Sequence, residues 1–341
     1  MAEGGLTVAV TGPTGDLGIA LVSALERSRR VKKIVGMARR PFDPAGQGWK
    51  KTEYRQGDVQ DKASVRDAVT GADVVVHLAF AIIGGGSDSR AINVDGSRIV
   101  FEAAIEGGAE RICYASSVAA YGFHQDNPDW LTEDVPPRGS PEMYYSQQKA
   151  EVEGILAQLL LKTTRTQAWV FRPCIVAGPR AQMLMEEIPY FQLSERMPDF
   201  VTRALSSMPF LKPVIPDVGA RFQFVHEDDA ASAFVAGALG KGEPGPYNLA
   251  APGTLTMKDL ADALDWYTVP LPDAAVEATA GIMSRIPSLP EAFAWVHTVR
   301  KPVLMKTERA KKQLGWKPQY TAKQTLKELV EAYRSEERVG H

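Results

Sequence analysis

The sequence predicts an α/β fold, a doubly wound parallel sheet with a smaller, interleaved C-terminal lobe. In the first half of the chain, short apolar runs alternate with segments whose apolar residues recur at helical spacing. The runs are apolar on both faces, as expected of parallel strands that helices cover on both sides. From Ala181 onward this alternation gives way to a stretch rich in proline, methionine and aromatic residues, which indicates a second lobe of different construction.

The predicted elements follow one another with short connections. Strands are predicted at 6–11, 32–37, 53–58, 73–80, 111–117 and 167–173. Helical spacing predicts helices at 16–28, 62–71, 92–108 and 143–162, and two of these end in glycine, a frequent C-terminal stop. The earlier pattern returns at 221–240 and 246–250, so we expect two interleaved lobes and not two domains joined by a linker.

Composition narrows the class of protein. A chain of 341 residues with 45% hydrophobic content can bury one sizeable core and a smaller appendage. A net charge of −2 gives no reason to expect a nucleic-acid partner, and no apolar run has the length of a membrane span or the form of a signal peptide. Cys113 and Cys174 each lie in an apolar run, which predicts buried, unpaired thiols and a cytoplasmic location.

No metal site is expected. The five histidines match no metal-ligand spacing. The run "HEDD" at 226–229 is interpreted as the start of a helix, because acidic residues in a first turn are stabilised by the helix dipole.

Three glycines point to a phosphate-binding loop. Gly12, Gly15 and Gly18 follow the first strand and open the first helix. Glycine there permits a tight turn, lets backbone N–H groups approach a pyrophosphate, and lets the helix pack closely on the strand. The helix N-terminus adds partial positive charge. We therefore predict a Rossmann-type fold that binds a dinucleotide. Asp16 would lie near the phosphates, so we expect it to cap the helix and point aside.

The end of the second strand indicates which dinucleotide binds. NAD-binding sheets carry an acidic residue there for the ribose hydroxyls, but this chain has Ala38 followed by Arg39 and Arg40. Guanidinium groups suit a 2′-phosphate, which favours NADP(H), while NAD(H) remains open. Asp58, after the third strand, suits the exocyclic amine of adenine.

Three polar residues form a candidate catalytic set. Tyr145 and Lys149 lie four residues apart on a predicted helix and therefore on one face. A phenol with a pKa of about 10 is a poor acid–base catalyst, but a nearby ammonium and a positive nicotinamide ring both lower that pKa. Ser117 lies at the carboxyl end of a strand, where open parallel sheets build their sites, and can hold the reacting oxygen beside Tyr145. Ser116 is expected to be structural.

At this point the chain resembles an extended short-chain dehydrogenase/reductase of the NAD-dependent epimerase/dehydratase type. The stretches that carry the resemblance span nearly the whole chain in the family's order and include "TGPTGDLG", "GDVQD", "VVHLA", "NVDGSRIV", "YASSVAAYG", "YYSQQKAEVE", "FRPCIVAGP" and "FVHEDDAASAF". The resemblance implies catalysis by Ser117, Tyr145 and Lys149, with Lys149 also on the nicotinamide ribose. It places Asn93 near the site and allows a homodimer. It implies further cofactor contacts from Thr14, Leu17, Val59, Leu78, Ala79, Phe80 and Pro173.

Departures from the family's pattern bear on the reaction. Sugar-nucleotide enzymes of the family usually have an asparagine where this chain has Ile175, and an arginine where it has Phe222. Isoleucine cannot bond a pyrophosphate. Dehydratases carry an Asp-Glu pair where this chain has Val118 and Ala119, so dehydration is not expected.

The residues that remain favour hydride transfer between a nicotinamide and a ketone or alcohol on a small or hydrophobic substrate. The apolar wall of that site would come from the segment 181–216, with Met183, Met185, Tyr190, Phe191, Met208 and Phe210. Two alternatives stay open: a nucleotide-sugar epimerase similar to UDP-glucose 4-epimerase, and a non-catalytic NADP-binding module. In each case we expect residues 1–180 and about 218–250 to bind the dinucleotide, and 181–217 and 251–341 to form the substrate-binding lobe.

Overall fold

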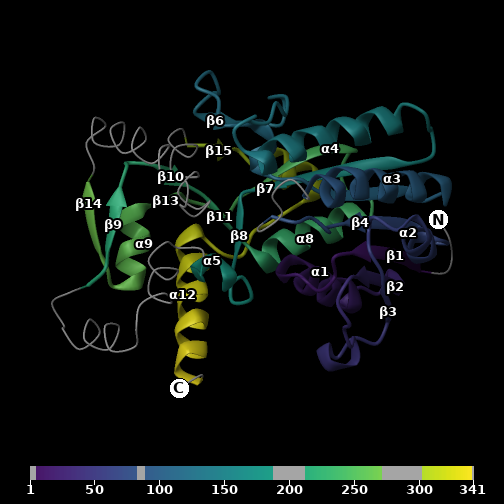
Figure 1. Cartoon of the computed structure of the whole chain (residues 1–341), viewed down its shortest axis with the longest axis horizontal. Helices are drawn as coiled ribbons and strands as arrows, with labels where there is room; N and C mark the ends of the chain where they lie inside the picture. Colours follow the sequence, from purple (N-terminus) through teal and green to yellow (C-terminus); the bar gives the residue numbers. More distant parts are fainter. Residues whose placement is uncertain (1–4, 83–88, 187–211, 271–301, 340–341) are drawn as a thin grey trace.

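A seven-stranded sheet in which every strand is parallel to its neighbours forms the centre of the molecule, as predicted (Figure 1). The computed structural model describes residues 5–82, 89–186, 212–270 and 302–339. The sheet has the order β12-β7-β5-β4-β1-β2-β3. Its strands are β1 (Leu6–Thr11), β2 (Val31–Ala38), β3 (Thr52–Gln56), β4 (Val74–His77), β5 (Arg111–Ala115), β7 (Gln167–Pro173) and β12 (Gly245–Leu249).

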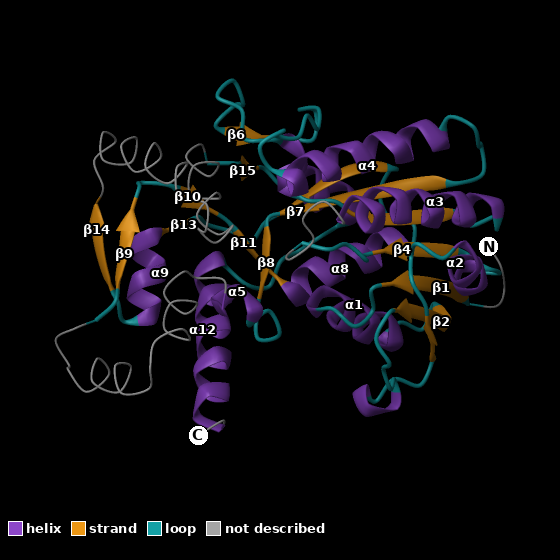
Figure 2. Cartoon of the chain, viewed as in Figure 1, coloured by secondary structure: helices purple, strands orange, loops and turns teal. Residues whose placement is uncertain are grey.

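Helices cover both faces of this sheet (Figure 2). One face packs against α1 (Asp16–Arg27) and α8 (Glu227–Ala238), which lie side by side. The other face packs against α2 (Lys62–Val69), α3 (Gly96–Glu106) and α4 (Tyr144–Leu160). The fold is therefore the doubly wound α/β class that the alternating periods predicted.

The central strands β1 and β4 are apolar on both faces because successive side chains enter different cores. On β1, Val8 and Val10 join the core beneath α1 and α8, whereas Ala9 joins the core beneath α2, α3 and α4. On β4, Val75 points to the opposite core from its two valine neighbours. Each fully buried valine contributes on the order of 1.5–3 kcal/mol of transfer free energy, so both cores stabilise the same strand.

The strand order reverses between β1 and β4. From β1 the chain winds outward to β2 and β3, and it then returns to β4 on the other side of β1. At such a reversal, the carboxyl edge of the sheet is where open α/β sheets bind their ligands, in a crevice between the loops that leave in opposite directions. The predicted site residues lie around this edge.

A second group of elements has its own core and lies away from the N-terminus (Figure 1). It contains α9 (Met257–Leu264), α12 (Ala322–Val339) and the short helix α5 (Met183–Glu186). Four pairs of short strands accompany these helices: β8 (Ile175–Ala177) with β11 (Phe224–His226), β10 (Arg221–Phe222) with β13 (Leu255–Thr256), β9 (Val214–Asp217) with β14 (Tyr267–Pro270), and β6 (Trp130–Leu131) with β15 (Leu304–Met305).

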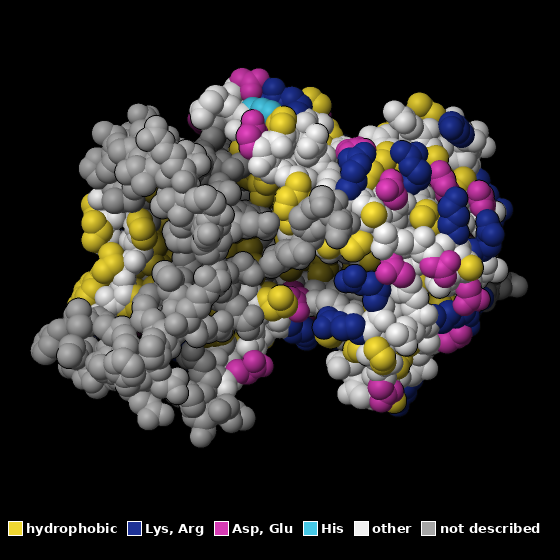
Figure 3. Space-filling model, in the orientation of Figure 1, with side chains coloured by type: hydrophobic (Ala, Val, Ile, Leu, Met, Phe, Trp, Pro, Cys, Tyr) yellow, Lys and Arg dark blue, Asp and Glu magenta, His cyan; other side chains and the backbone are white. Residues whose placement is uncertain are grey.

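The two parts of the chain interleave, because β6 belongs to the first half of the sequence and β15 to its end. On the face drawn in Figure 3, basic and acidic side chains intermingle over the part that contains α1 to α3. None of the helices in the described part of the chain has the length and apolar character that crossing a membrane requires.

Several boundaries differ from those predicted. The strand expected at 73–80 ends at His77, and Leu78 N–H makes the last backbone bond to β1, to the carbonyl of Thr11 (3.1 Å). The helix expected at 92–108 begins with a π-helical turn, Ala91–Asp95. Of the apolar wall expected from 181–216, Met185 is buried in the second core and Met183 is exposed. The remaining members lie outside the described residues: Tyr190, Phe191, Met208 and Phe210.

Candidate functional site

The three glycines of the loop after β1 do not serve the same purpose. Gly12 has φ +77°, and a Cβ there would lie 2.9 Å from the backbone nitrogen of Ala79. A Cβ on Gly18 would lie 2.2 Å from the carbonyl oxygen of Gly12. Both positions therefore need glycine for the turn and for the close approach of α1. A Cβ on Gly15 would meet nothing nearer than 3.9 Å, so Gly15 borders open space at the start of the helix.

The N-terminus of α1 is free to receive an anion. Gly15 is the N-cap residue and supplies no side chain, so no side chain bonds the first N–H groups of the helix. The expected capping by Asp16 is wrong, because the helix begins at Asp16 itself and its carboxylate lies one position too late to cap. Thr14 and Leu17 are partly exposed on the same loop. Uncapped N–H groups at a glycine cradle suit a pyrophosphate.

In the loop after β2, hydrogen bonds from β3 hold the backbone in place, whereas the arginine side chains of the loop stay exposed. Gln56 donates to the carbonyl of Arg39 (2.9 Å), and the Tyr54 hydroxyl bonds the carbonyls of Ala38 and Arg40. Both arginine side chains are exposed, and neither has a carboxylate partner within 4.0 Å among the described residues. A basic pair is thus presented at the carboxyl end of β2.

The turn after β3 also differs from a simple open loop. The carboxylate of Asp58 accepts a hydrogen bond from the backbone of Gln60 (2.9 Å), which leaves its second oxygen available. Val59 is buried against Gly96, where a Cβ would lie 2.7 Å from the valine side chain. Val59 therefore shapes the crevice wall and presents little of its own surface.

The loop after β4 is held on two sides. The amide of Asn93, in the π-helical turn, accepts from Ala81 N–H (2.7 Å) and donates to the Ala81 carbonyl (2.9 Å). The hydroxyl of Tyr144 donates to the carbonyl of Ile82 (2.7 Å). This clamp positions the preceding residues, which run along the crevice from Leu78 through Ala79 to Phe80.

Phe80 brings an aromatic ring to the predicted catalytic pair. Its ring packs edge-on against Tyr145, with centroids 5.6 Å apart. The amine of Lys149 lies 3.5 Å from the centre of the Phe80 ring and 5.7 Å from the centre of the Tyr145 ring. The ammonium is attracted to both ring faces.

The structure brings the three predicted catalytic residues together. Tyr145 and Lys149 lie one turn apart on the same face of α4, and Lys149 Nζ donates to the carbonyl of Ala115 at the end of β5 (2.7 Å). Ser117 follows that strand and accepts from Ala119 N–H (3.1 Å), and its side chain acts on the pKa of the Tyr145 hydroxyl. Pro173 ends the neighbouring strand β7 and is buried.

The pKa of Tyr145 does not shift in the direction that we expected. Burial raises the pKa of Tyr145, and the side chain of Ser117 opposes that rise only in part. Burial lowers the pKa of Lys149 well below its ordinary value, against the charge of Glu153. The predicted lowering of the Tyr145 pKa by Lys149 is therefore wrong for the protein alone, because desolvation of the phenolate outweighs the other influences on it.

A buried ion pair behind Lys149 was not anticipated. Glu153 accepts two hydrogen bonds from Arg172 (2.9 and 2.6 Å) and one from Ser116 (2.5 Å). The side chains of Arg172 and Glu153 are 3% and 7% exposed. The sequence carried one signal for this pair, since Tyr145, Lys149 and Glu153 are spaced four residues apart along one helix face.

A buried histidine, His77, ends β4 and contacts α3. His77 Nδ1 is 2.7 Å from the hydroxyl of Thr11, and Nε2 is 2.8 Å from that of Ser97. Burial, together with the charge of Lys149, lowers the pKa of His77 to about 3. This neutral ring packs against the rings of Phe101 and Tyr114 in the core.

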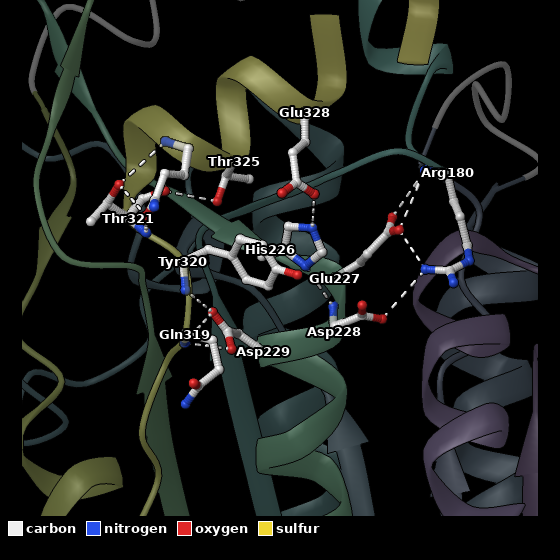
Figure 4. A network of polar contacts seen from close by, with 11 residues as sticks. Arg180, His226, Glu227, Asp228, Asp229, Gln319, Tyr320, Thr321, Thr325 and Glu328 are labelled. Carbon is white, nitrogen blue, oxygen red and sulfur yellow. Dashed lines mark hydrogen bonds and ion pairs between the residues drawn. The ribbon is translucent and has the colours of Figure 1, made fainter. Parts of the chain in front are cut away.

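The acidic run at 226–229 begins α8, as predicted (Figure 4). His226 is the N-cap and accepts from the backbone of Asp228, while Asp229 bonds the backbone N–H groups of Gln319 and Tyr320. Glu227 binds Arg180, which follows β8. No group of three His, Cys, Asp or Glu side chains within the described ranges is arranged to hold a metal ion. Both cysteines are buried and unpaired.

Curated relatives match different shares of the chain and extend beyond the matched part. Mycobacterium tuberculosis Rv2047c is 29% identical over 339 residues, which is 98% of this chain and 31% of that protein. Sterol demethylase protein B of Methylococcus capsulatus is 30% identical over 182 residues, which is 50% of this chain and 55% of that protein. The chain thus spans less than two thirds of the length of either relative.

Solved structures share the fold. A short-chain dehydrogenase/reductase superfamily protein from Agrobacterium tumefaciens, crystallised with bound NAD, superposes with a TM-score of 0.72 at 20% identity and covers 98% of this chain and 99% of its own. The model of the NAD dependent epimerase/dehydratase family matches residues 8–250, which contain the glycine loop, the three predicted catalytic residues and all seven strands of the main sheet except the first two residues of β1. The chain therefore belongs to the NAD-dependent epimerase/dehydratase family.

Proposed function

We propose that this protein is an NAD(P)-dependent oxidoreductase that moves a hydride between a nicotinamide and a ketone or alcohol on a hydrophobic substrate. The observation that carries the proposal is the meeting of Ser117, Tyr145 and Lys149 at the carboxyl edge of the sheet, beside the loops at its switch point.

The residues present fit a dinucleotide. Gly15 borders open space at an uncapped helix N-terminus, which suits a pyrophosphate, and the loop after β4 suits the nicotinamide half. Arg39 and Arg40 suit a 2′-phosphate, so we propose NADP(H) as the preferred cofactor, although the Agrobacterium protein was crystallised with NAD. Asp58 would receive the adenine amine. When bound, the nicotinamide supplies or accepts the hydride.

The proton moves through Tyr145. Because burial raises its pKa, Tyr145 is a neutral phenol near pH 7 and can donate its proton to a carbonyl oxygen, which favours reduction. The side chain of Ser117 acts on the same hydroxyl and would orient the substrate oxygen beside it. Lys149 offers its ammonium, held by the Ala115 carbonyl, to the phenolate that remains.

The surroundings of the site favour an apolar substrate. Ile82 and Ile175 are 47% and 42% exposed, and Phe80 and Val118 are partly exposed. Ile175 cannot bond a diphosphate, which argues against a nucleotide sugar. The resemblance of half the chain to sterol demethylase protein B supports a large hydrophobic ketone or alcohol as substrate.

The competing reaction is epimerisation, which the family's name includes. An epimerase returns the hydride to the same substrate, so its cofactor shows no net oxidation. We also propose that residues 1–180 and about 218–250 bind the dinucleotide and that the rest binds substrate. In support, the seven strands of the main sheet all fall within the first set.

The test combines cofactor titration with turnover. NADPH and NADH are titrated by fluorescence, and cofactor absorbance is then followed with a panel of aliphatic, aromatic and sterol ketones. We expect tighter binding of NADPH and its oxidation by a hydrophobic ketone, with Tyr145→Phe binding NADPH normally and losing turnover at least about 100-fold. If the protein binds NADPH, no ketone oxidises it, and UDP-sugars are interconverted, the protein is an epimerase and the proposed reaction is wrong.

A further inference from the structure

The loop after β4 places the ring of Phe80 on the proposed catalytic pair. The ring packs edge-on against Tyr145, and the amine of Lys149 lies 3.5 Å from the ring centre. A side chain on a loop keeps such a place only where the backbone beside it is held. Ala81, the next residue, is held at both of its backbone polar groups, since the Asn93 amide bonds its N–H (2.7 Å) and its carbonyl (2.9 Å). Asn93 thus fixes the backbone next to Phe80.

Gln148, on α4, holds the amide of Asn93 in turn. Oε1 of Gln148 accepts from Asn93 Nδ2 (2.8 Å), and Nε2 of Gln148 donates to the hydroxyl of Ser89 (3.0 Å). Both hydrogens of Asn93 Nδ2 are used, one by Ala81 and one by Gln148. Asn93 and Ser89 are fully buried and Gln148 is 6% exposed. Loss of the glutamine amide would therefore leave a buried N–H of Asn93 without its partner, which is costly.

These contacts form a closed circuit that begins and ends on α4. Gln148 binds Asn93, Asn93 binds Ala81, and the ring of the residue before Ala81 returns to the helix at Lys149. Gln148 directly precedes Lys149 in the sequence. Successive residues of a helix point about 100° apart, so one side of α4 binds the loop while the adjoining side presents the amine. The loop and the catalytic helix face therefore fix each other.

We propose that Gln148 is a positioning residue, which acts through Asn93 to hold the loop after β4 so that the ring of Phe80 lies against Lys149 and Tyr145. The inference rests on the proposed function, since its effect requires a hydrophobic substrate that binds against this ring. It gives a reason for a buried amide beside the catalytic lysine: the position needs a side chain that accepts one hydrogen bond and makes a second.

Steady-state kinetics at saturating NADPH, with the best hydrophobic ketone of the panel, test the proposal. We expect Gln148→Met, which keeps the length of the side chain and loses both bonds, to raise KM by about fivefold or more. In the Phe80→Ala background the same substitution should change KM by less than about twofold, because the ring that it would displace is already absent. Gln147→Met is the matched control, since it makes the same change at the neighbouring, exposed glutamine.

A conservative variant separates positioning from folding. Gln148→Glu keeps an oxygen for Asn93 Nδ2 and a second that the Ser89 hydroxyl can bond, so KM should stay within about twofold of the unmodified value. If Gln148→Met does not fold, Gln148→Asn, which is too short to keep both bonds, takes its place in the same comparison. Melting temperatures show which variants are folded.

The outcomes distinguish the two proposals. If the unmodified protein oxidises NADPH with no ketone, the proposed function fails and the role of Gln148 fails with it. If the unmodified protein turns over but loss of the Gln148 bonds leaves KM unchanged, only the role of Gln148 is overturned. The same holds if the substitution raises KM as much in the Phe80→Ala background as in the unmodified protein, since Gln148 then does not act through the ring.

Discussion

The ammonium of Lys149 lies against the face of Phe80, 3.5 Å from the ring centre, on the side of α4 that also carries Tyr145. The ring shields the amine from water and at the same time offers an apolar surface to whatever approaches the tyrosine hydroxyl. Phe80 was expected only as a cofactor contact, yet its ring contacts both Tyr145 and Lys149, the proposed catalytic pair.

Shortening Phe80 should weaken the binding of hydrophobic substrates. Phe80→Ala removes the aromatic wall beside Tyr145, and we expect KM for a hydrophobic ketone to rise by about tenfold. Phe80→Leu keeps most of the apolar surface and should change KM by less than about threefold. Steady-state kinetics at saturating NADPH measure both, and equal effects of the two variants would show that apolar contact is not the contribution of Phe80.

Removing the charge of Glu153 should shift the pH dependence of catalysis. The carboxylate raises the pKa of Lys149 against the effect of burial, so Glu153→Gln lowers that pKa further. The ammonium is then lost at a lower pH, and the alkaline limb of the kcat profile should move down by about one pH unit. Glu151→Gln, on the same helix in an exposed pair with Arg90, is the control and should leave the limb in place.

His77 should make the protein sensitive to acid. The pKa of His77 is about 3 in the folded protein and 6.5 in the unfolded chain. Below pH 6.5 the unfolded chain therefore binds a proton that the folded protein does not. The free energy of unfolding is at its full value above pH 6.5 and falls as the pH decreases towards 3. His77→Asn should lower the free energy of unfolding at pH 7 by about 2 kcal/mol and flatten its pH dependence below 6.5 by up to about 1.4 kcal/mol per unit. Urea unfolding at several pH values measures this, with His124→Asn as control. If the free energy of unfolding of His77→Asn still falls below pH 6.5 as steeply as that of the unmodified protein, other groups cause the acid sensitivity.

Substitutions at two glycines of the loop should affect different properties, one the stability of the fold and the other the binding of the cofactor. Gly18→Ala places a Cβ 2.2 Å from the Gly12 carbonyl oxygen and should cost about 1–3 kcal/mol of stability. Gly15→Ala meets no atom nearer than 3.9 Å and should leave the melting temperature almost unchanged, but weaken cofactor binding by filling the cradle. Calorimetry and fluorescence titration give the two numbers, and normal binding by Gly15→Ala would place the pyrophosphate elsewhere.

Arg39 and Arg40 should discriminate between the two cofactors. Their exposed guanidinium groups would pair with a 2′-phosphate that NADH lacks. The double substitution Arg39→Ala/Arg40→Ala should therefore weaken NADPH by about tenfold or more and leave NADH within about twofold. Equal losses for both cofactors, or none for NADPH, would remove the basis for preferring NADP(H).

The sequence predicted the fold well because its information is local and periodic. The order of strands and helices follows from apolar spacing, and the bounds of β1 and β7 agree to the residue. Strand ends were less predictable, since β4 stops at His77 and not at Phe80. The placement of the glycines, and of Tyr145 and Lys149 on one helix face, was predictable for the same local reason.

Interactions between distant segments were beyond the sequence. The capping expected of Asp16 and the lowered pKa expected of Tyr145 both depended on what surrounds those groups, and burial decided the second. Arg180 meets Glu227 from 47 positions away, and Arg172 meets Glu153 from 19. No local pattern reports such pairings, although the spacing of Glu153 from Lys149 was visible.

The pairing of β6 with β15 sets a condition on biosynthesis. Strand β6 lies in the loop between Ser117 and Tyr145, and the strand that it pairs with, β15, comes much later in the chain, at Leu304–Met305. Domains assemble during synthesis from the N-terminus, so the large sheet can form on the ribosome before this loop has its partner strand. The newborn polypeptide should consequently acquire competence for chemistry late and in one step, once the segment that contains β15 has been made and has docked.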